Sequence, residues 1–150
     1  YEFANTIHRT IKESDFKWSL SRSAECFNLP LSRSQVQQLY DNLLEKYVDE
    51  DTDARDFFRA LTGFQFEKKN EFKRINWIHK EKRSLALFIG KLIEEYQRPD
   101  KLKIPQMANL FLHRGLESKF HSTTEYYDAD RSGKFEDLKM FIDDTKKCKN

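Results

Sequence analysis

Glycine, proline and cysteine are all scarce in this chain of 150 residues, which holds four glycines, three prolines and two cysteines. Phosphate-binding loops and dinucleotide fingerprints need several glycines at short spacing, and neither these motifs nor Gly-x-Ser-x-Gly occurs in the sequence. The two cysteines, Cys26 and Cys148, lie near opposite ends of the chain, whereas a small secreted domain held by disulfides usually has more. We therefore expect free thiols and a reducing, cytoplasmic location.

Long apolar runs are missing as well. The longest run of consecutive apolar residues covers only residues 85–89, whereas a membrane-spanning helix needs about 20. No segment combines a charged start, an apolar centre and a small-residue cleavage site, so we expect no signal peptide. The chain begins at Tyr1 rather than Met, which leaves open that a leader or an N-terminal part preceded it. These patterns predict a soluble protein without a membrane partner.

The sequence also lacks recognisable groupings of catalytic or metal-binding residues. The four histidines show no pairing at helical ligand spacing, and Cys-x-x-Cys is absent, so we expect no zinc site. Residues 128–133, Asp-Ala-Asp-Arg-Ser-Gly, resemble the first half of an EF-hand calcium loop. However, the twelfth loop position, where a bidentate Glu belongs, holds Lys139. We favour a polar turn here, and we predict no metal, no cofactor and no enzymatic activity.

What the chain has in quantity is charge, 35% of its residues, and aromatic side chains, 14%, among them thirteen Phe. Aromatic groups of this number can offset the entropy cost of ordering the chain, which argues against disorder. The net charge is only +2, but its distribution is uneven. Residues 41–56 hold seven acids and two bases, whereas residues 68–83 hold seven bases and two acids. We expect an acidic face and a basic face on one surface.

The first half of the chain predicts a poorly defined segment over residues 1–30 and a helical hairpin over residues 31–66. Ser32 or Ser34 can cap a first helix, in which apolar residues recur at spacings of three and four from Val36 to Tyr47. A second helix is expected to start at residues 52–53 and to end at Gly63, which suits a left-handed C-cap. Its expected buried residues are Phe57, Phe58 and Leu61.

The second half, residues 67–150, predicts a part that resembles a helix-turn-helix. Across residues 64–77, apolar residues alternate loosely with charge, which is typical of an extended connection or a short strand with the aromatic residues in the core. Helices are expected over residues 81–96, 105–114 and from about residue 134, and residues 116–132 are expected to be irregular with Phe120, Tyr126 and Tyr127 as anchors. The fold class we predict is therefore mainly α, a single-domain helical bundle with a helix-turn-helix or winged-helix-like C-terminal half and a small hairpin.

The basic segment over residues 68–83 is followed by two expected helices, residues 81–96 and 105–114. Together they suggest contacts with a nucleic acid. Cations close to the helices would contact phosphates, and the outward residues of helix 105–114 would face a groove of DNA. The expected phosphate contacts are Lys80, Lys82, Arg83, Lys101 and Lys103. The expected groove-facing residues are Gln106, Asn109, His113 and Arg114.

A family resemblance adds to this interpretation. The residues that carry it are Ile75-Asn76-Trp77, then Arg83 to Leu92, then Ile104, Ala108 and Phe111, then Arg131, Lys134-Phe135 and Leu138. Their order resembles the C-terminal region of RteC-type proteins, regulators in tetracycline-resistance conjugative elements of Bacteroides, and of related proteins from Bacteroidetes. The resemblance covers residues 75–142, with a looser extension back to Leu39. It implies a winged-helix-like DNA-binding module and a role in regulating transfer genes of a mobile element.

The sequence thus leaves two hypotheses open. The first is a DNA-binding regulator that contacts double-stranded DNA through the residues named above. The second is a non-enzymatic adaptor, whose acidic face over residues 41–56 or basic face over residues 68–83 docks an oppositely charged protein.

Overall fold

The computed structural model describes residues 9–11, 27, 29–64, 72–96, 104–120 and 124–147. This part of the chain is mainly helical, as the sequence predicts, and it also carries a small three-stranded sheet. Most of the poorly defined segment expected over residues 1–30 lies outside the described residues, and so do Cys26 and Cys148.

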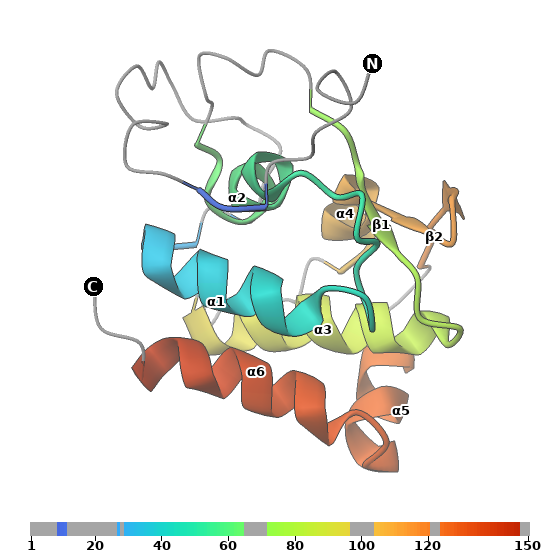
Figure 1. Ribbon diagram of the computed structural model, residues 1–150. Helices are drawn as coiled ribbons and strands as arrows, with labels where there is room; N and C mark the ends of the chain where they lie inside the picture. Colours follow the sequence, from blue (N-terminus) through green and yellow to red (C-terminus); the bar gives the residue numbers. More distant parts are fainter. Residues whose placement is uncertain are drawn as a thin grey trace.

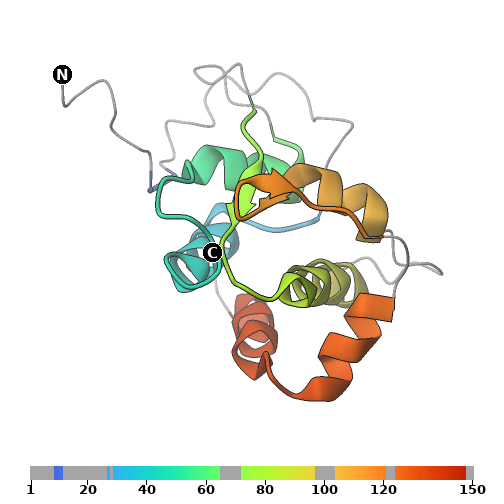
Figure 2. The same ribbon diagram turned by 90° about the vertical axis from the view of Figure 1, so that its right-hand side faces the viewer.

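The elements stack in three tiers, which can be followed in both ribbon views (Figures 1 and 2). The upper tier holds α2 (Ala54–Thr62), the sheet and α4 (Ile104–Met107), the middle tier α1 (Arg33–Leu43) and α3 (Lys82–Tyr96), and the lower tier α5 (Thr124–Ser132) and α6 (Glu136–Lys147). The middle tier is covered on both sides, since α3 contacts α4, α5 and α6, and α1 contacts α2 and α6. Residues 84–90 of α3 are accordingly all buried.

Helix α1 begins at the capping residue that the sequence offers. The Ser32 hydroxyl accepts the N–H of Gln35 at 3.2 Å, and the Gln35 side-chain oxygen accepts the N–H of Ser32 at 2.8 Å. This reciprocal pair satisfies two N–H groups that a helix start leaves without intrahelical partners. The helix buries the expected face, formed by Val36, Leu39, Tyr40 and Leu43.

The end of α1 differs from the prediction, which extends the apolar face to Tyr47. The helix ends at Leu43, because Glu45 adopts a left-handed backbone with φ 74° and the chain reverses there. Tyr47 is nevertheless buried, since the turn directs its ring against Trp77 at a centroid distance of 5.3 Å. The apolar spacing thus identified the buried residues correctly, apart from the partly buried Leu44, but not the helix end.

Helix α2 follows the prediction at both ends. The Asp53 side chain accepts the N–H of Arg55 as an N-cap, and Gly63 ends the helix in a left-handed conformation with φ 83°. Both residues favour these places for local reasons, since a carboxylate accepts the free N–H groups of the first turn and glycine adopts positive φ without strain. Phe57, Phe58 and Leu61 are buried as expected.

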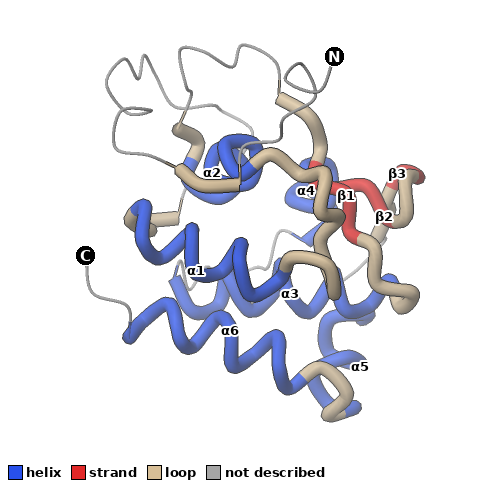
Figure 3. The backbone as a smooth tube through the Cα atoms, in the orientation of Figure 1, coloured by secondary structure: helices blue, strands red, loops and turns tan. Residues whose placement is uncertain are grey.

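The sheet joins segments that are far apart in the sequence (Figure 3). Strand β1 (Ile75–Trp77) pairs in parallel with β2 (Phe111–His113), which pairs antiparallel with β3 (Leu116–Glu117). Of the two alternatives for residues 64–77, the short strand is confirmed over residues 75–77, and the small hairpin, expected without a position, lies at residues 111–117. Trp77 of β1 lies at the centre of the core, with ring centroids 5.0 Å from Phe88 and 6.2 Å from Phe111.

The predicted helix over residues 105–114 is wrong in its second half. Helix α4 is a single turn with Pro105 inside it, a 3-10 helix (Ala108–Leu110) follows, and residues 111–113 form β2. Pairing with β1 places Phe111 in the core and gives the backbone of β2 its hydrogen-bond partners. This tertiary gain outweighs the helical spacing of the segment, a competition that local sequence patterns do not reveal.

Residues 116–132 are also more regular than predicted, since they contain β3 and α5. Phe120 and Tyr126 are buried as expected, whereas Tyr127 is 49% exposed. Helix α6 confirms the last predicted helix, with Leu138 and Ile142 buried.

Candidate functional site

The loop between β1 and α3 lies at the centre of a surface built from three separate segments. The end of β2 is fixed to it by two hydrogen bonds: His113 Nε2 lies 2.7 Å from the carbonyl oxygen of His79, and the N–H of Arg114 donates to the carbonyl of Trp77 at 2.8 Å. The loop between α5 and α6 also reaches it, because the ring of Phe135 packs edge-on against His79 with centroids 5.6 Å apart.

Six cationic residues lie on this loop or on the segments fixed next to it. The ammonium group of Lys82, in the first turn of α3, contacts the carbonyl oxygen of Lys119 and lies 4.7 Å from the centroid of the Phe120 ring. Lys134 Nζ lies 3.8 Å from a carboxylate oxygen of Glu81. We call this surface the basic edge, and it consists of Lys80, Lys82, Arg83, Arg114, Lys119 and Lys134.

The charges of the basic edge are only partly neutralised. Glu81 lies among the cations and pairs with Arg83 at 3.1 Å, and this hydrogen bond, with help from Lys134, holds the pKa of the Glu81 carboxyl below its ordinary value. In the described ranges, no carboxylate forms an ion pair with Lys80, Arg114 or Lys119. All three are exposed, so their charges face the solvent.

His79, in the loop between β1 and α3, stabilises this surface through contacts with Tyr47 and Glu81. Its ring stacks on Tyr47 with centroids 5.0 Å apart, and its Nδ1 accepts the N–H of Glu81 at 3.1 Å. Burial lowers the pKa of His79, although Glu81 opposes the shift. The neutral ring with an unprotonated Nδ1 is the form that can accept this hydrogen bond. His79 therefore fixes the position of the loop and does not add to its charge.

The tip of the β2–β3 hairpin carries Arg114 in an unfavourable conformation. His113 pairs with Leu116, so Arg114 and Gly115 form a two-residue turn, and both have positive φ, 52° and 81°. Turns of this kind favour Asn-Gly or Gly-Gly, because a side chain with Cβ costs roughly 1–2 kcal/mol in the left-handed region. The fold thus holds Arg114 in a backbone conformation that arginine disfavours. Residues in such conformations cluster at functional sites, so we consider a role for the guanidinium group of Arg114.

The hairpin tip is held firmly to β1. The N–H of Gly115 donates to Asn76 Oδ1 at 2.8 Å, and the Asn76 amide in turn donates to Asp49 Oδ2 at 3.1 Å. Together with the bond from Arg114 to Trp77, these contacts fix both residues of the turn.

The structure brings together four of the predicted site residues: Lys80, Lys82, Arg83 and Arg114. Gln106 and Asn109 are exposed on α4 and on the 3-10 helix that follows. His113 differs from the prediction, because it lies in β2, is half-buried, and has its Nε2 engaged by the His79 carbonyl. Lys101 and Lys103 lie outside the described residues. Sequence reasoning missed Lys119 and Lys134, since only tertiary contacts bring them to the basic edge.

An acidic cleft lies beside the start of β1, where the acidic segment meets Lys73 and Arg74. It has a volume of about 160 Å³ and is lined by Asp49, Asp51, Thr52, Asp53, Asp56, Lys73, Arg74 and Asn76. Several of its carboxylates already have structural partners: Asp53 pairs with Arg55 at 2.8 Å, and Asp56 accepts the N–H of Lys73 at 3.4 Å. Within the described ranges, no group of three His, Cys, Asp or Glu side chains has an arrangement that could hold a metal ion.

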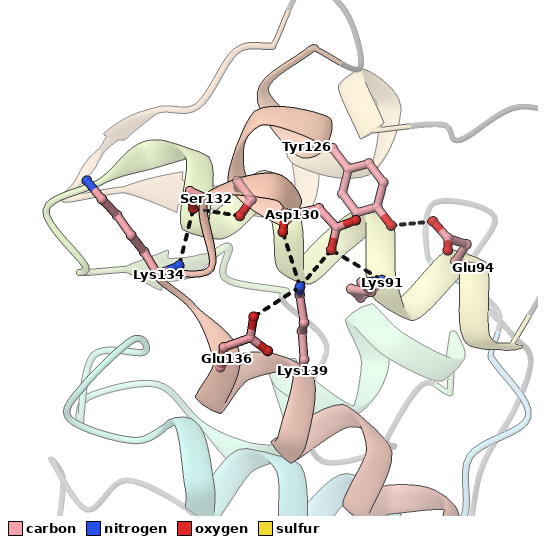
Figure 4. A network of polar contacts seen from close by, with 9 residues as sticks. Lys91, Glu94, Tyr126, Asp130, Ser132, Lys134, Glu136 and Lys139 are labelled. Atoms are coloured by element: carbon pink, nitrogen blue, oxygen red, sulfur yellow. Dashed lines mark hydrogen bonds and ion pairs between the residues drawn. The ribbon is translucent and has the colours of Figure 1, made fainter.

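The segment that resembles half of a calcium loop is helical instead of forming the expected turn. Residues 124–132 form α5. Asp130 Oδ1 forms ion pairs with Lys139 Nζ at 2.8 Å and with Lys91 Nζ at 3.5 Å (Figure 4). Lys139 Nζ also contacts the Asp130 carbonyl at 3.2 Å and Glu136 at 3.4 Å. The ammonium group of Lys139 thus contacts oxygens of Asp130 and Glu136, while the carboxylate of Asp128 pairs with Arg131.

No protein-family model matches the chain, and comparisons with curated proteins and with solved structures also find no significant match. In the part of the chain that the structure describes, no helix is both long and apolar enough to cross a membrane.

Proposed function

We propose that this chain is a DNA-binding regulatory protein that contacts the phosphate backbone through its basic edge. The observation that supports this most directly is the exposure of Lys80, Arg114 and Lys119, three cations without an ion-pair partner in the described residues, on segments fixed around one loop. Cations carried on fixed backbone segments suit the regular row of phosphates in a duplex, and binding releases the counterions condensed on the DNA.

The order of the elements supports a winged-helix-like form of this proposal. β1, α3, α4 and the β2–β3 hairpin follow one another in the order strand, helix, helix, hairpin. The second helix is short, but Gln106 and Asn109 are exposed on it and on the adjoining 3-10 turn. Both side chains can donate to and accept from base edges. The resemblance to RteC-type proteins adds the regulation of a mobile element to this proposal.

The test is fluorescence anisotropy of a labelled duplex of random sequence, titrated with the protein at several salt concentrations. If three to five phosphates are neutralised, log K falls against log salt with a slope of roughly −3 to −5. Lys80→Glu and Arg114→Glu should each weaken binding and reduce the slope by about 1 or more.

Lys147→Glu provides the matched control. It reverses the same charge on an exposed lysine at the far end of α6, so it changes the net charge equally without altering the basic edge. Equal effects of Lys80→Glu and Lys147→Glu would mean that only net charge matters. No binding at low salt would rule out the proposal.

The acidic cleft favours a second candidate function, in which the chain is an adaptor that docks a cationic segment of a protein. Asp51 is exposed at the cleft, and its neighbour Asp49 is fixed by the Asn76 amide. This candidate predicts that a lysine- and arginine-rich peptide binds the chain and that Asp51→Asn weakens this binding. Lys80→Glu should leave the affinity for this peptide unchanged, whereas Asp51→Asn should leave the affinity for DNA unchanged.

A further inference from the structure

The hairpin tip presents a large, exposed apolar side chain, Leu116, two residues after Arg114. Leu116 is 74% exposed, more than the other exposed large hydrophobic residues of the described chain, Tyr127 at 49% and Met140 at 54%. A single exposed leucine is common on protein surfaces and has no functional meaning by itself. Leu116, however, follows a two-residue turn whose arginine is held with φ 52°, and the exposed cation of Lys119 comes three residues later.

We propose that this tip acts as a wedge on DNA: Arg114 enters the minor groove and Leu116 inserts between neighbouring base pairs, so that the bound duplex is bent. The inference rests on the proposed DNA binding and adds the mode of contact. The minor groove is about 6 Å wide, which is too narrow for a helix but admits an extended arginine side chain. Its negative potential attracts arginine, and leucine is among the apolar side chains that unstack base steps when inserted there.

The anchoring of the tip suits this role. A wedge must keep its position while the DNA deforms, and here both N–H groups of the turn are bonded to β1, one to the carbonyl of Trp77 and one to the Asn76 side chain. Trp77 itself is fully buried, so the turn is fixed to the core. The cost of ordering the tip is thus met during folding and not during binding.

The surrounding charges suit DNA better than an apolar protein surface. Lys80, in the β1–α3 loop, and Lys119, in the segment after β3, are both exposed, and the carboxylate of Glu117 in β3 is paired with Arg74. A hydrophobic protein partner would have to desolvate these cations without compensation. This charge complementarity makes a polyanion the occupant that we propose.

The experiment measures bending and affinity on one sample. A duplex of about 25 base pairs with central TA steps, which kink readily, carries a donor and an acceptor dye at its two ends. The wild-type chain should raise the energy-transfer efficiency as it binds, corresponding to a bend of roughly 20–90°. Leu116→Ser should bind with an affinity reduced by less than about tenfold and should leave the duplex straight.

Two further variants make the test specific. Leu116→Phe keeps an apolar wedge and should preserve the bend, whereas Met140→Ser removes an exposed apolar side chain from α6 and should leave both affinity and bend unchanged. Because Leu116 is exposed, none of these substitutions at position 116 removes core packing.

The outcomes separate the inference from the function on which it rests. If the wild-type chain binds without bending, or if Leu116→Ser bends the duplex as well as the wild type, the wedge is refuted while DNA binding stands. If no binding occurs, both fail. If Leu116→Ser changes only the sedimentation of the free protein, Leu116 serves a contact between protein chains, and the wedge is refuted as well.

Discussion

The indole Nε1–H of Trp77 donates to the hydroxyl oxygen of Ser84 at 2.9 Å, and both residues are fully buried. The Ser84 hydroxyl in turn donates to the carbonyl of Glu81 at 2.6 Å. This chain of two bonds joins β1 to the first turn of α3, and it therefore determines the course of the loop at the centre of the basic edge.

Ser84→Ala should lower the free energy of unfolding by about 1–3 kcal/mol, because it leaves the buried indole N–H of Trp77 without an acceptor. Urea denaturation followed by far-ultraviolet circular dichroism measures this loss. The same substitution in a Trp77→Phe background should cost less, since the unsatisfied donor is then absent. An equal cost in both backgrounds would show that the hydrogen bond contributes little.

Gly90→Ala should destabilise the fold, although alanine favours a helix over glycine by roughly 1 kcal/mol. A Cβ atom at Gly90 would lie 2.2 Å from Cδ1 of Tyr126, whose ring packs against α3 and whose hydroxyl bonds to Glu94. Relieving this overlap requires α5 to move, with an expected net loss of about 1–3 kcal/mol. Thermal unfolding checks this, and the loss should shrink when Tyr126 is replaced by Leu in the same chain.

Two neighbouring serines allow a matched test of the capping of α1. Ser32→Ala removes the hydroxyl that accepts the Gln35 N–H and should cost about 1 kcal/mol of stability. Ser34→Ala, inside the helix, should be neutral or slightly stabilising, because alanine is the better helix former. Chemical denaturation of both variants decides this; similar losses would refute the assignment of Ser32 as the cap.

The Asp130–Lys139 pair predicts how stability depends on pH. The hydrogen bond from Lys139, assisted by Lys91, holds the pKa of Asp130 below its ordinary value, so its folded pKa lies below the unfolded one. Its contribution is thus complete above about pH 4 and disappears as the pH falls through the folded pKa.

Asp130→Asn should therefore cost roughly 0.5–1 kcal/mol at neutral pH and flatten the acid limb of a stability–pH curve. Asp128→Asn on the same helix serves as the control, since it removes a carboxylate from a more exposed pair with Arg131. Equal flattening by both substitutions would contradict the role assigned to Asp130.

Arg114→Asn should raise stability and weaken DNA binding at the same time. Asparagine tolerates the left-handed backbone that Arg114 adopts at φ 52°, so the gain should be about 0.5–1 kcal/mol. The loss of one cation should lower the salt slope of binding by about 1. Parallel measurements of melting temperature and anisotropy test this, and unchanged binding would mean that the arginine is not kept for its charge.

The parts of the fold that could be predicted from the sequence are those that local interactions determine. α1, α2 and α3 each show apolar residues at helical spacing, and Ser32, Asp53 and Gly63 mark helix ends through contacts within their own turns. These signals lie within a few residues of the element that they define, so no tertiary knowledge is needed.

The remaining parts depend on partners elsewhere in the chain. Residues 111–113 have no local preference strong enough to exclude a helix, and they become a strand because β1 offers hydrogen bonds and a pocket for Phe111. The basic edge was predictable only in part for the same reason. Lys80, Lys82 and Arg83 are neighbours in sequence, whereas Lys119 and Lys134 reach them only through the fold.

The parallel pairing of β1 with β2 also has a kinetic consequence. The β2–β3 hairpin is local and can close within about 1–10 μs, but its attachment to β1 must wait until α3 has folded back across the intervening chain. The bond from the Arg114 N–H to the Trp77 carbonyl therefore forms only when the hairpin has docked on β1. Native-state amide exchange at Arg114 should occur through opening of the whole domain, although the residue lies at an exposed turn where fast exchange would be expected.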